Sequence, residues 1–164
     1  MRTVLRLLAA TALGTLVATG AAPQGAGTAS PVFGVTIPDG YRQWEVVAPS
    51  HVPSFDELRA ILGNGVAMKA YRDAALPFPE GAILAKLAWQ HVPSAEFAGA
   101  FVAGPATSIQ FMVKDSKRYV ATGGWGFGKF VDGKPVDEAE HKACFACHEA
   151  HVKGHDYVFT RLAR

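Results

Sequence analysis

Residues 124–131 read Gly124-Trp125-Gly126-Phe127-Gly128-Lys129-Phe130-Val131, a run in which aromatic side chains alternate with glycine. Side chains two residues apart lie on one face of a β-strand, so this alternation predicts a strand with a strongly apolar face. The next four residues, Asp132-Gly133-Lys134-Pro135, are typical of a turn that closes a strand. This stretch decides the fold class, because a period of two does not suit a bundle of helices.

Other segments on the N-terminal side of this strand also favour β structure. Ala82 to Gln90 is a short apolar run, and Ser108 to Val113 is another. Tyr119 to Thr122 follows a polar turn at residues 115–117 and is read as a further strand. We therefore expect an α+β fold that is mainly an antiparallel β-sheet with a few helices, in a single domain.

Helix signals are few. Ser54 with Glu57 three residues later has the form of a capping box, and it predicts a helix over residues 54–62. The helix is expected to continue, or to restart after Gly63-Asn64, through residues 66–74, until the prolines at 77 and 79 force a turn. A last helix is predicted to begin near Asp137.

The last predicted helix carries Cys144-Phe145-Ala146-Cys147-His148. This is the C-x-x-C-H pattern by which c-type haem is attached to a protein chain. Two thiols three residues apart on a helix both reach the haem vinyl groups and form thioethers. The adjacent His148 then points its imidazole at the iron as an axial ligand. The sequence therefore predicts one covalent haem c with its iron ligated by His148.

Other chemistries for the two cysteines fit less well. A thioredoxin-like C-x-x-C would lie early in a βαβ pattern, whereas this one lies at the end of the chain. A zinc site would need further ligands, for which His141, His151 and His155 are nearby. A plain Cys144–Cys147 disulfide in an exported domain is the remaining alternative.

The N-terminus has the order of a secretory signal. Arg2 and Arg6 precede an apolar run from Leu7 to Val17, and small residues follow up to Ala22. We predict a signal peptide over residues 1–22, a flexible Gly/Pro/Ser/Thr-rich tether over 23–31 and a haem domain over 32–164. The protein is expected to be exported, for instance to the periplasm, and soluble, with no membrane span after cleavage.

The charge balance argues against nucleic acid as a partner. Lysine and arginine number 16 against 14 acidic residues, and Arg2 and Arg6 account for the whole excess. The mature chain therefore has a net charge near zero, and a strongly basic face is not predicted.

Several segments, taken in order, carry a family resemblance. They are Tyr41-Arg42-Gln43-Trp44, residues 59–64 (RAILGN), residues 77–86 (PFPEGAILAK), residues 111–115 (FMVKD), residues 123–127 (GGWGF), residues 144–149 (CFACHE) and residues 156–160 (DYVFT). With this set the chain resembles the cytochrome P-460 family, which includes the β-type cytochromes c′. The resemblance implies a mostly β fold holding one high-spin haem, with histidine on one side of the iron and an open site on the other.

Two activities are implied by this resemblance. Members of the P-460 type oxidise hydroxylamine and carry a bond from a lysine to a meso carbon of the porphyrin. The β-type c′ members lack that bond and bind gases such as nitric oxide beneath a cap of aromatic side chains. Either activity would involve a small-molecule ligand, the enzyme would pass electrons to a partner cytochrome, and the family resemblance makes a homodimer a further expectation.

Lys86 is the first choice for a lysine that bonds to haem. It interrupts the apolar run of residues 82–90, where a cation is costly, and on a strand it shares a face with Leu84 and Ala88. Burial would lower its pKa and supply a neutral amine. An edge-strand lysine that reaches water is the ordinary alternative. Lys69 on a helix is second, and Lys114 before Asp115 is read as a local ion pair.

An oxidase also needs a base near the iron. Asp115 and Glu140 are the preferred candidates for this base, and Asp132 and Glu138 are the other acidic candidates. For the aromatic cap Phe78 is preferred, because prolines hold it on both sides; the other candidates are Phe33, Phe101 and Phe111.

A methionine on the iron would give a different protein. Met68 or Met112 as sixth ligand would close the site, and the chain would then be an electron carrier with a six-coordinate haem. Methionine more often fills gaps in a core, which is the competing interpretation for both residues.

Overall fold

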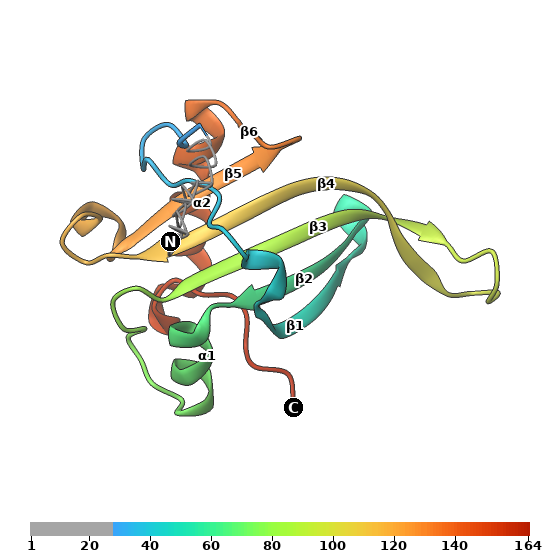
Figure 1. The fold of residues 1–164 in the computed structure, drawn as a ribbon, viewed down its shortest axis with the longest axis horizontal. Coiled ribbons are helices and arrows are strands. Elements are labelled where there is room, and N and C mark those ends of the chain that lie inside the picture. The colour runs from blue at the N-terminus through green and yellow to red at the C-terminus, as the bar shows by residue number, and fades with distance from the viewer. Residues whose placement is uncertain (1–27) are drawn as a thin grey trace, which may run out of the picture.

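The computed structural model describes residues 28–164, which fold around one antiparallel sheet of six strands (Figure 1). The strands lie in the sheet in chain order, and each pairs with the next. They are β1 (Glu45–Val52), β2 (Glu57–Gly63), β3 (Ile83–Pro93), β4 (Phe101–Lys114), β5 (Trp125–Val131) and β6 (Lys134–Pro135). The helices are α1 (Gly65–Arg72) and α2 (Glu138–Val152), with 3-10 turns η1 (Tyr41–Gln43), η2 (Pro53–Phe55), η3 (Val120–Thr122) and η4 (Lys153–His155). The mainly antiparallel α+β prediction is confirmed.

The predicted helix over residues 54–62 is wrong. Ser54 lies in η2, Asp56 turns the chain with a φ of 50°, and β2 begins at Glu57. As a strand, this segment pairs with β1 on one side and β3 on the other. A capping box is worth about 1 kcal/mol, which a strand with two hydrogen-bonded neighbours and a buried face outweighs.

The predicted strand over residues 119–122 is also wrong, because this segment closes the connection between β4 and β5. The Asp115 carboxylate accepts hydrogen bonds from the backbone N–H groups of Lys117 and Arg118 and turns the chain away from β4. The Thr122 hydroxyl then donates to the Trp125 carbonyl oxygen over 2.7 Å. Local side-chain bonds of this kind compete with strand pairing.

Both helices begin at side-chain caps. The Asn64 side chain accepts from the Ala67 N–H over 2.9 Å and starts α1, so the predicted helix restarts after Gly63-Asn64. The Asp137 carboxylate accepts from the Glu140 N–H over 2.9 Å and starts α2 where the sequence predicted it. Such caps satisfy backbone donors that the first turn leaves free.

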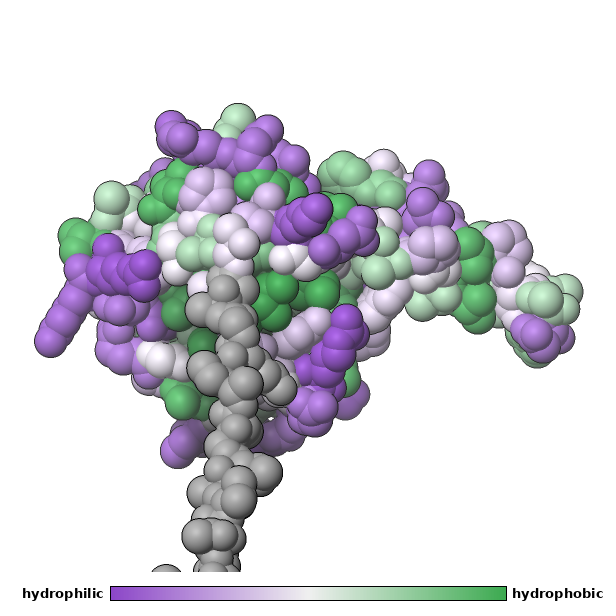
Figure 2. All heavy atoms as spheres, turned by 45° about the horizontal axis from the view of Figure 1, so that its top comes forward, coloured by the Kyte–Doolittle hydropathy of each residue, from purple (hydrophilic) through white to green (hydrophobic). Residues whose placement is uncertain are grey.

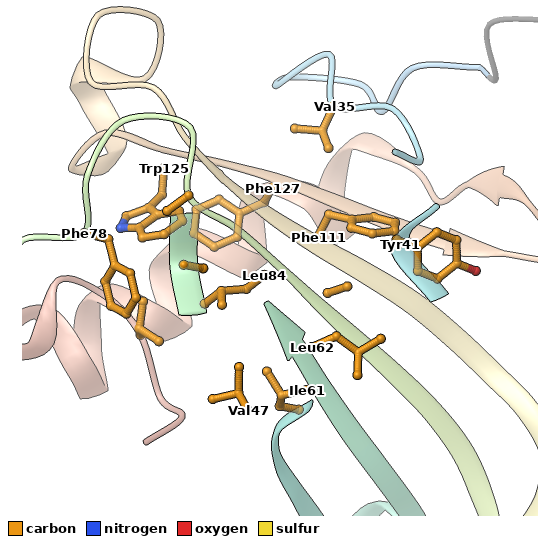
Figure 3. Close-up of a cluster of buried hydrophobic side chains, with 14 of the residues drawn as sticks. Val35, Tyr41, Val47, Ile61, Leu62, Phe78, Leu84, Phe111, Trp125 and Phe127 are labelled. Carbon is orange, nitrogen blue, oxygen red and sulfur yellow. The ribbon is translucent and has the colours of Figure 1, made fainter. Parts of the chain in front are cut away.

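The core lies on both faces of the sheet (Figure 3). Trp125 packs edge-on against Phe78, with ring centroids 5.7 Å apart, while Phe111 meets Tyr41 at 5.3 Å. Gly126 faces away from Trp125, and its neighbour there is the Tyr119 ring. The glycines of residues 124–131 are therefore positions where other segments press against β5.

Replacing Gly126 with alanine is expected to destabilise the fold. A Cβ at this position would lie 2.2 Å from Cζ of Tyr119, a buried ring that is also held by its hydroxyl. We expect a loss of about 1–3 kcal/mol in the free energy of unfolding. Chemical denaturation monitored by fluorescence measures it. Gly65→Ala is the control, since nothing lies within 4 Å of its Cβ, and equal stability of the two variants would contradict the packing argument.

The predicted leader lies outside the described residues, as do residues 23–27 of the predicted tether. Ser30, which the sequence analysis assigned to the tether, is buried, and its hydroxyl donates to the Phe127 carbonyl oxygen over 3.1 Å. The packed domain therefore includes Ser30. Across residues 28–164, none of the helices has the length and apolar character needed to cross a membrane.

The ends of β3 and β4 extend past their neighbours as a hairpin arm, defined here as residues 91–103 (Figures 1 and 2). Phe97 and Phe101 are exposed on it, at 71% and 49%. Phe101 stacks on His91 with centroids 4.6 Å apart. Phe101, a candidate for the aromatic cap, thus lies on the arm.

Candidate functional site

Helix α2 packs against β5 and leaves a cavity of about 1050 Å³ between the helix, the sheet and the C-terminal segment. Each of the strands β1 to β5 supplies part of its wall. The volume slightly exceeds the range of about 300–1,000 Å³ found for ligand and cofactor sites, so there is room for a large group.

The α2 wall carries the C-x-x-C-H motif. Cys144, Cys147 and His148 are spaced i, i+3 and i+4, so they project from one side of the helix, and all three line the cavity. Both thiols are free, and the disulfide alternative is not formed. Burial raises the pKa of Cys144, which keeps it a neutral thiol at neutral pH.

His148 is oriented by the segment after α2. Its Nδ1 lies 2.6 Å from the Tyr157 carbonyl oxygen, which only accepts hydrogen bonds. Nδ1 therefore carries the proton, and Nε2 has the lone pair that a metal ligand needs. The ring packs between Phe127 and Phe159, at 5.1 and 4.9 Å. Burial lowers the pKa of His148, so the neutral form is favoured.

Lys86 points into the same cavity from β3, where it pairs with Ile61 of β2 and Gln110 of β4. Burial, reinforced by the nearby Arg59 guanidinium, lowers the pKa of Lys86 to about 8. Leu84 lines the cavity too, as expected for a residue on the same face of the strand. The structure thus brings Lys86 and the cysteine–histidine motif together in one cavity.

A carboxylate that sequence reasoning missed lies in this wall. Glu57 accepts a 2.7 Å hydrogen bond from Arg59 and a 3.0 Å hydrogen bond from the Thr107 hydroxyl. Burial would raise the pKa of Glu57, but these bonds outweigh it and hold the pKa below its usual value. Glu57 was read as part of a capping box, so the mistaken helix hid it. Alternation of Glu57, Arg59 and Ile61 on one strand face would have been the signal.

The predicted bases are separated by the fold. Glu140 lines the cavity and forms an ion pair with Lys129. Asp115 caps the loop after β4 and is not part of the cavity wall. Asp132 lies in the exposed turn after β5, and Glu138 pairs with Lys142 over 2.5 Å.

The aromatic candidates also separate. Phe78 is 3% exposed and packs between Tyr71 and Trp125 in the core (Figure 3), so it does not line the cavity. Phe33 likewise lies outside the wall, whereas Phe111 contributes to it. Two aromatic residues that the sequence analysis did not single out, Phe55 and Phe159, line the cavity instead.

The remaining candidates are divided in the same way. Met112 lines the cavity, but Met68 is buried in the core. Lys69 is exposed and pairs with Asp73. Lys114 pairs with Asp156, 42 residues away, so the predicted local pair with Asp115 is wrong.

The three other histidines of this region do not converge on a metal position. His141 is buried, and its Nε2 accepts from the Lys129 N–H. His151 is exposed, and its Nδ1 lies 2.9 Å from the Cys147 carbonyl oxygen. His155 bonds to the Val158 carbonyl oxygen. Within residues 28–164 no group of three His, Cys, Asp or Glu side chains is placed to hold a metal ion.

These residues fit a haem. The cavity is large, its lining surface taken as a whole is mostly apolar, and one helix face offers it two free thiols and an imidazole nitrogen with a free lone pair. Apolar walls with a few polar groups are typical of cofactor sites. Cations are also present in the wall, at Lys86, Lys129 and Arg161, where anionic groups of a cofactor would find partners.

Comparison with known proteins agrees with this geometry. The family model described as Cytochrome P460 matches residues 38–160, which span the described fold from before β1 to the segment after α2. No curated protein matches the chain. The matched range contains the sheet, the cavity and the cysteine–histidine motif, and on this basis the chain belongs to the cytochrome P460 family and is a haem cytochrome.

Proposed function

We propose that this protein is an exported c-type cytochrome that acts on small nitrogen species at an open haem site, by oxidising hydroxylamine or by binding nitric oxide. Cys144 and Cys147 would hold the haem through thioethers, and His148 Nε2 would be its axial ligand. The observation that carries the proposal is Lys86, a lysine of lowered pKa that faces the cavity containing the motif. An electron carrier has no need of a reactive amine there.

Lys86 would supply the amine for a bond to the haem. With a pKa of about 8, about a tenth of its amine is neutral at pH 7 and has a free lone pair, far more than for an ordinary lysine. Forming the N–C bond replaces one N–H and one C–H bond, releasing two protons and two electrons. An oxidant of the peroxide class would accept those electrons.

The cavity wall provides groups for substrate protons. A bound haem supplies a coordination position for the nitrogen compound and a route for its electrons. Glu57 lines the cavity and is ionised at neutral pH, so its carboxylate would accept protons that hydroxylamine releases as it is oxidised. Phe55 and Phe159, which are both exposed, add apolar surface to the wall of the cavity. The electrons would pass to a partner cytochrome.

The absorption spectrum of the reduced protein tests the proposal. A red-shifted Soret band, with a mass gain that survives thioether cleavage, is expected if Lys86 is bonded to the haem. Hydroxylamine turnover with an added electron acceptor then identifies the oxidase. A high-spin c-type spectrum without turnover would leave nitric oxide binding as the activity.

Glu57→Gln is expected to lower hydroxylamine turnover by about 10²–10⁴-fold, because glutamine keeps the shape but cannot accept a proton. Haem content and spectrum should stay unchanged. Glu140→Gln is the matched control, since Glu140 also lines the cavity but pairs with Lys129 at its more exposed side. Steady-state kinetics measure both, and an equal loss in the two variants would argue against a specific role for Glu57.

A second function is favoured by Met112, which lines the cavity from β4 beside Leu84 and Phe127. A thioether bond to iron would make the haem six-coordinate and the protein an electron carrier. A low-spin spectrum with a methionine-to-iron charge-transfer band would establish this alternative. Its disappearance in Met112→Leu would identify the ligand.

A further inference from the structure

A buried ion pair joins the end of β4 to the segment after α2. Lys114 Nζ lies 2.8 Å and 2.9 Å from the two carboxylate oxygens of Asp156, and the side chains are 4% and 9% exposed. Lys114 also donates to the Gly123 carbonyl oxygen over 3.1 Å and lies 5.0 Å from the centre of the Trp125 ring. Neither charged residue lines the cavity, so the function proposed above does not account for them.

The pair holds a stretch of unusual backbone. Asp156 and Tyr157 are consecutive non-glycine residues with φ of 47° and 62°, a left-handed conformation that side chains other than glycine rarely adopt. Asp156 also accepts from the Phe78 N–H over 2.8 Å, and Phe78 packs on Trp125 (Figure 3). Two segments far from Asp156 in sequence, the end of β4 and the stretch before β3, therefore fix its position.

The residue after Asp156 is the one that orients His148. The Tyr157 carbonyl oxygen accepts from His148 Nδ1 over 2.6 Å. The Tyr157 ring lies against Gly123, where a Cβ would be 2.1 Å from its Cε2 atom. Lys114 donates to the carbonyl oxygen of the same Gly123. One lysine therefore contacts both Asp156, which precedes Tyr157 in the chain, and Gly123, against which the Tyr157 ring packs. The positions of the carbonyl oxygen and of the imidazole are thus coupled to a buried charge pair.

We propose that Lys114 and Asp156 are positioning residues that hold the Tyr157 carbonyl group against Nδ1 of His148 and so set the donor strength of this ligand toward the haem iron. The hydrogen bond gives the imidazole partial anionic character, which strengthens its bond to iron and stabilises the ferric state. This inference rests on the proposed ligation by His148, and it assigns to a remote ion pair control of the reduction potential.

The alternative is that the pair only stabilises the fold. Buried ion pairs often contribute little net stability, because desolvation offsets their attraction. Replacing Lys114 with methionine and Asp156 with asparagine would then leave the haem properties unchanged. The choice between the two roles therefore needs a measurement on the ligand rather than on stability.

The test uses haem-loaded protein carrying Lys114→Met together with Asp156→Asn. The double change removes one positive and one negative charge, so the direct electrostatic effect on the haem largely cancels. Asparagine tolerates the left-handed conformation and keeps an acceptor for the Phe78 N–H. We expect a higher reduction potential and a lower iron–histidine stretching frequency in the resonance Raman spectrum of the ferrous protein. The control is Lys69→Met with Asp73→Asn, the same charge change in an exposed pair.

The single variant Lys114→Met separates the effect of charge from the effect of positioning. Removing a cation alone would lower the reduction potential of the haem. Loss of the positioning of the Tyr157 carbonyl group would still lower the iron–histidine stretching frequency. Unchanged frequency in both Lys114 variants would overturn the inference. So would variants that fail to load haem while the control loads normally, because the pair would then serve the fold. An unmodified ferrous protein that is high-spin and five-coordinate but has no iron–histidine band would instead overturn the proposed ligation by His148, whereas a low-spin six-coordinate spectrum would overturn the open site.

Discussion

Replacing His148 with alanine should abolish the iron–histidine band and lower hydroxylamine turnover by on the order of 100-fold or more. The side chain that presents Nε2 to the cavity is lost, while Cys144 and Cys147 remain to hold the haem. Imidazole added to the solution should restore part of the spectrum, because the truncation leaves a space of matching shape between Phe127 and Phe159. Resonance Raman and absorption spectra of the ferrous protein measure both effects.

His151→Ala is the control for this experiment. His151 lies on the same helix three residues after His148 and is exposed. Its Nδ1 contacts only the backbone carbonyl oxygen and the thiol of Cys147. Its loss should leave the spectrum unchanged. An intact iron–histidine band in His148→Ala, with a loss in His151→Ala, would transfer the ligand role to His151 and contradict the proposal.

Lys86→Ala should leave haem attachment intact but remove the red-shifted Soret band and the residual mass gain. The pKa of Lys86 adds a pH dependence: below about pH 8 the amine is mostly protonated, and above it the neutral form prevails. The rate of bond formation in freshly loaded protein should therefore rise about tenfold per pH unit as the pH increases toward 8, and level off above pH 8. Time-resolved absorption after addition of peroxide measures the rate.

Lys69→Ala is the matched control, because Lys69 is exposed and outside the cavity wall. Lys86→Arg is a second control that keeps the charge but does not supply a neutral amine. Persistence of the spectral signature in Lys86→Ala would exclude this lysine. A rate that does not vary between pH 6 and pH 9 would show that deprotonation of Lys86 does not limit the reaction.

Local patterns predicted the parts of the fold in which neighbours in sequence decide the structure. The alternation at Trp125 and Phe127 gave β5, and the caps at Asn64 and Asp137 gave the starts of α1 and α2. The same reasoning failed at residues 54–62, where local capping favours a helix. The segment becomes a strand because β1 and β3 flank it, and pairing over that range is invisible to a local pattern.

The sequence alone determined the cysteine–histidine motif, its placement on a helix, the mainly β class and the position of Lys86 as a cation within an apolar strand, since each depends on spacing along a few residues. Tertiary structure decided which other side chains meet them. It brought Glu57 into the cavity, kept Phe78 and Asp115 out of it, and paired Lys114 with Asp156 instead of Asp115. The reason is physical: the register of a sheet and the path of the chain between strands bring together residues far apart in sequence, and burial and charge pairing then act on whatever side chains they bring together.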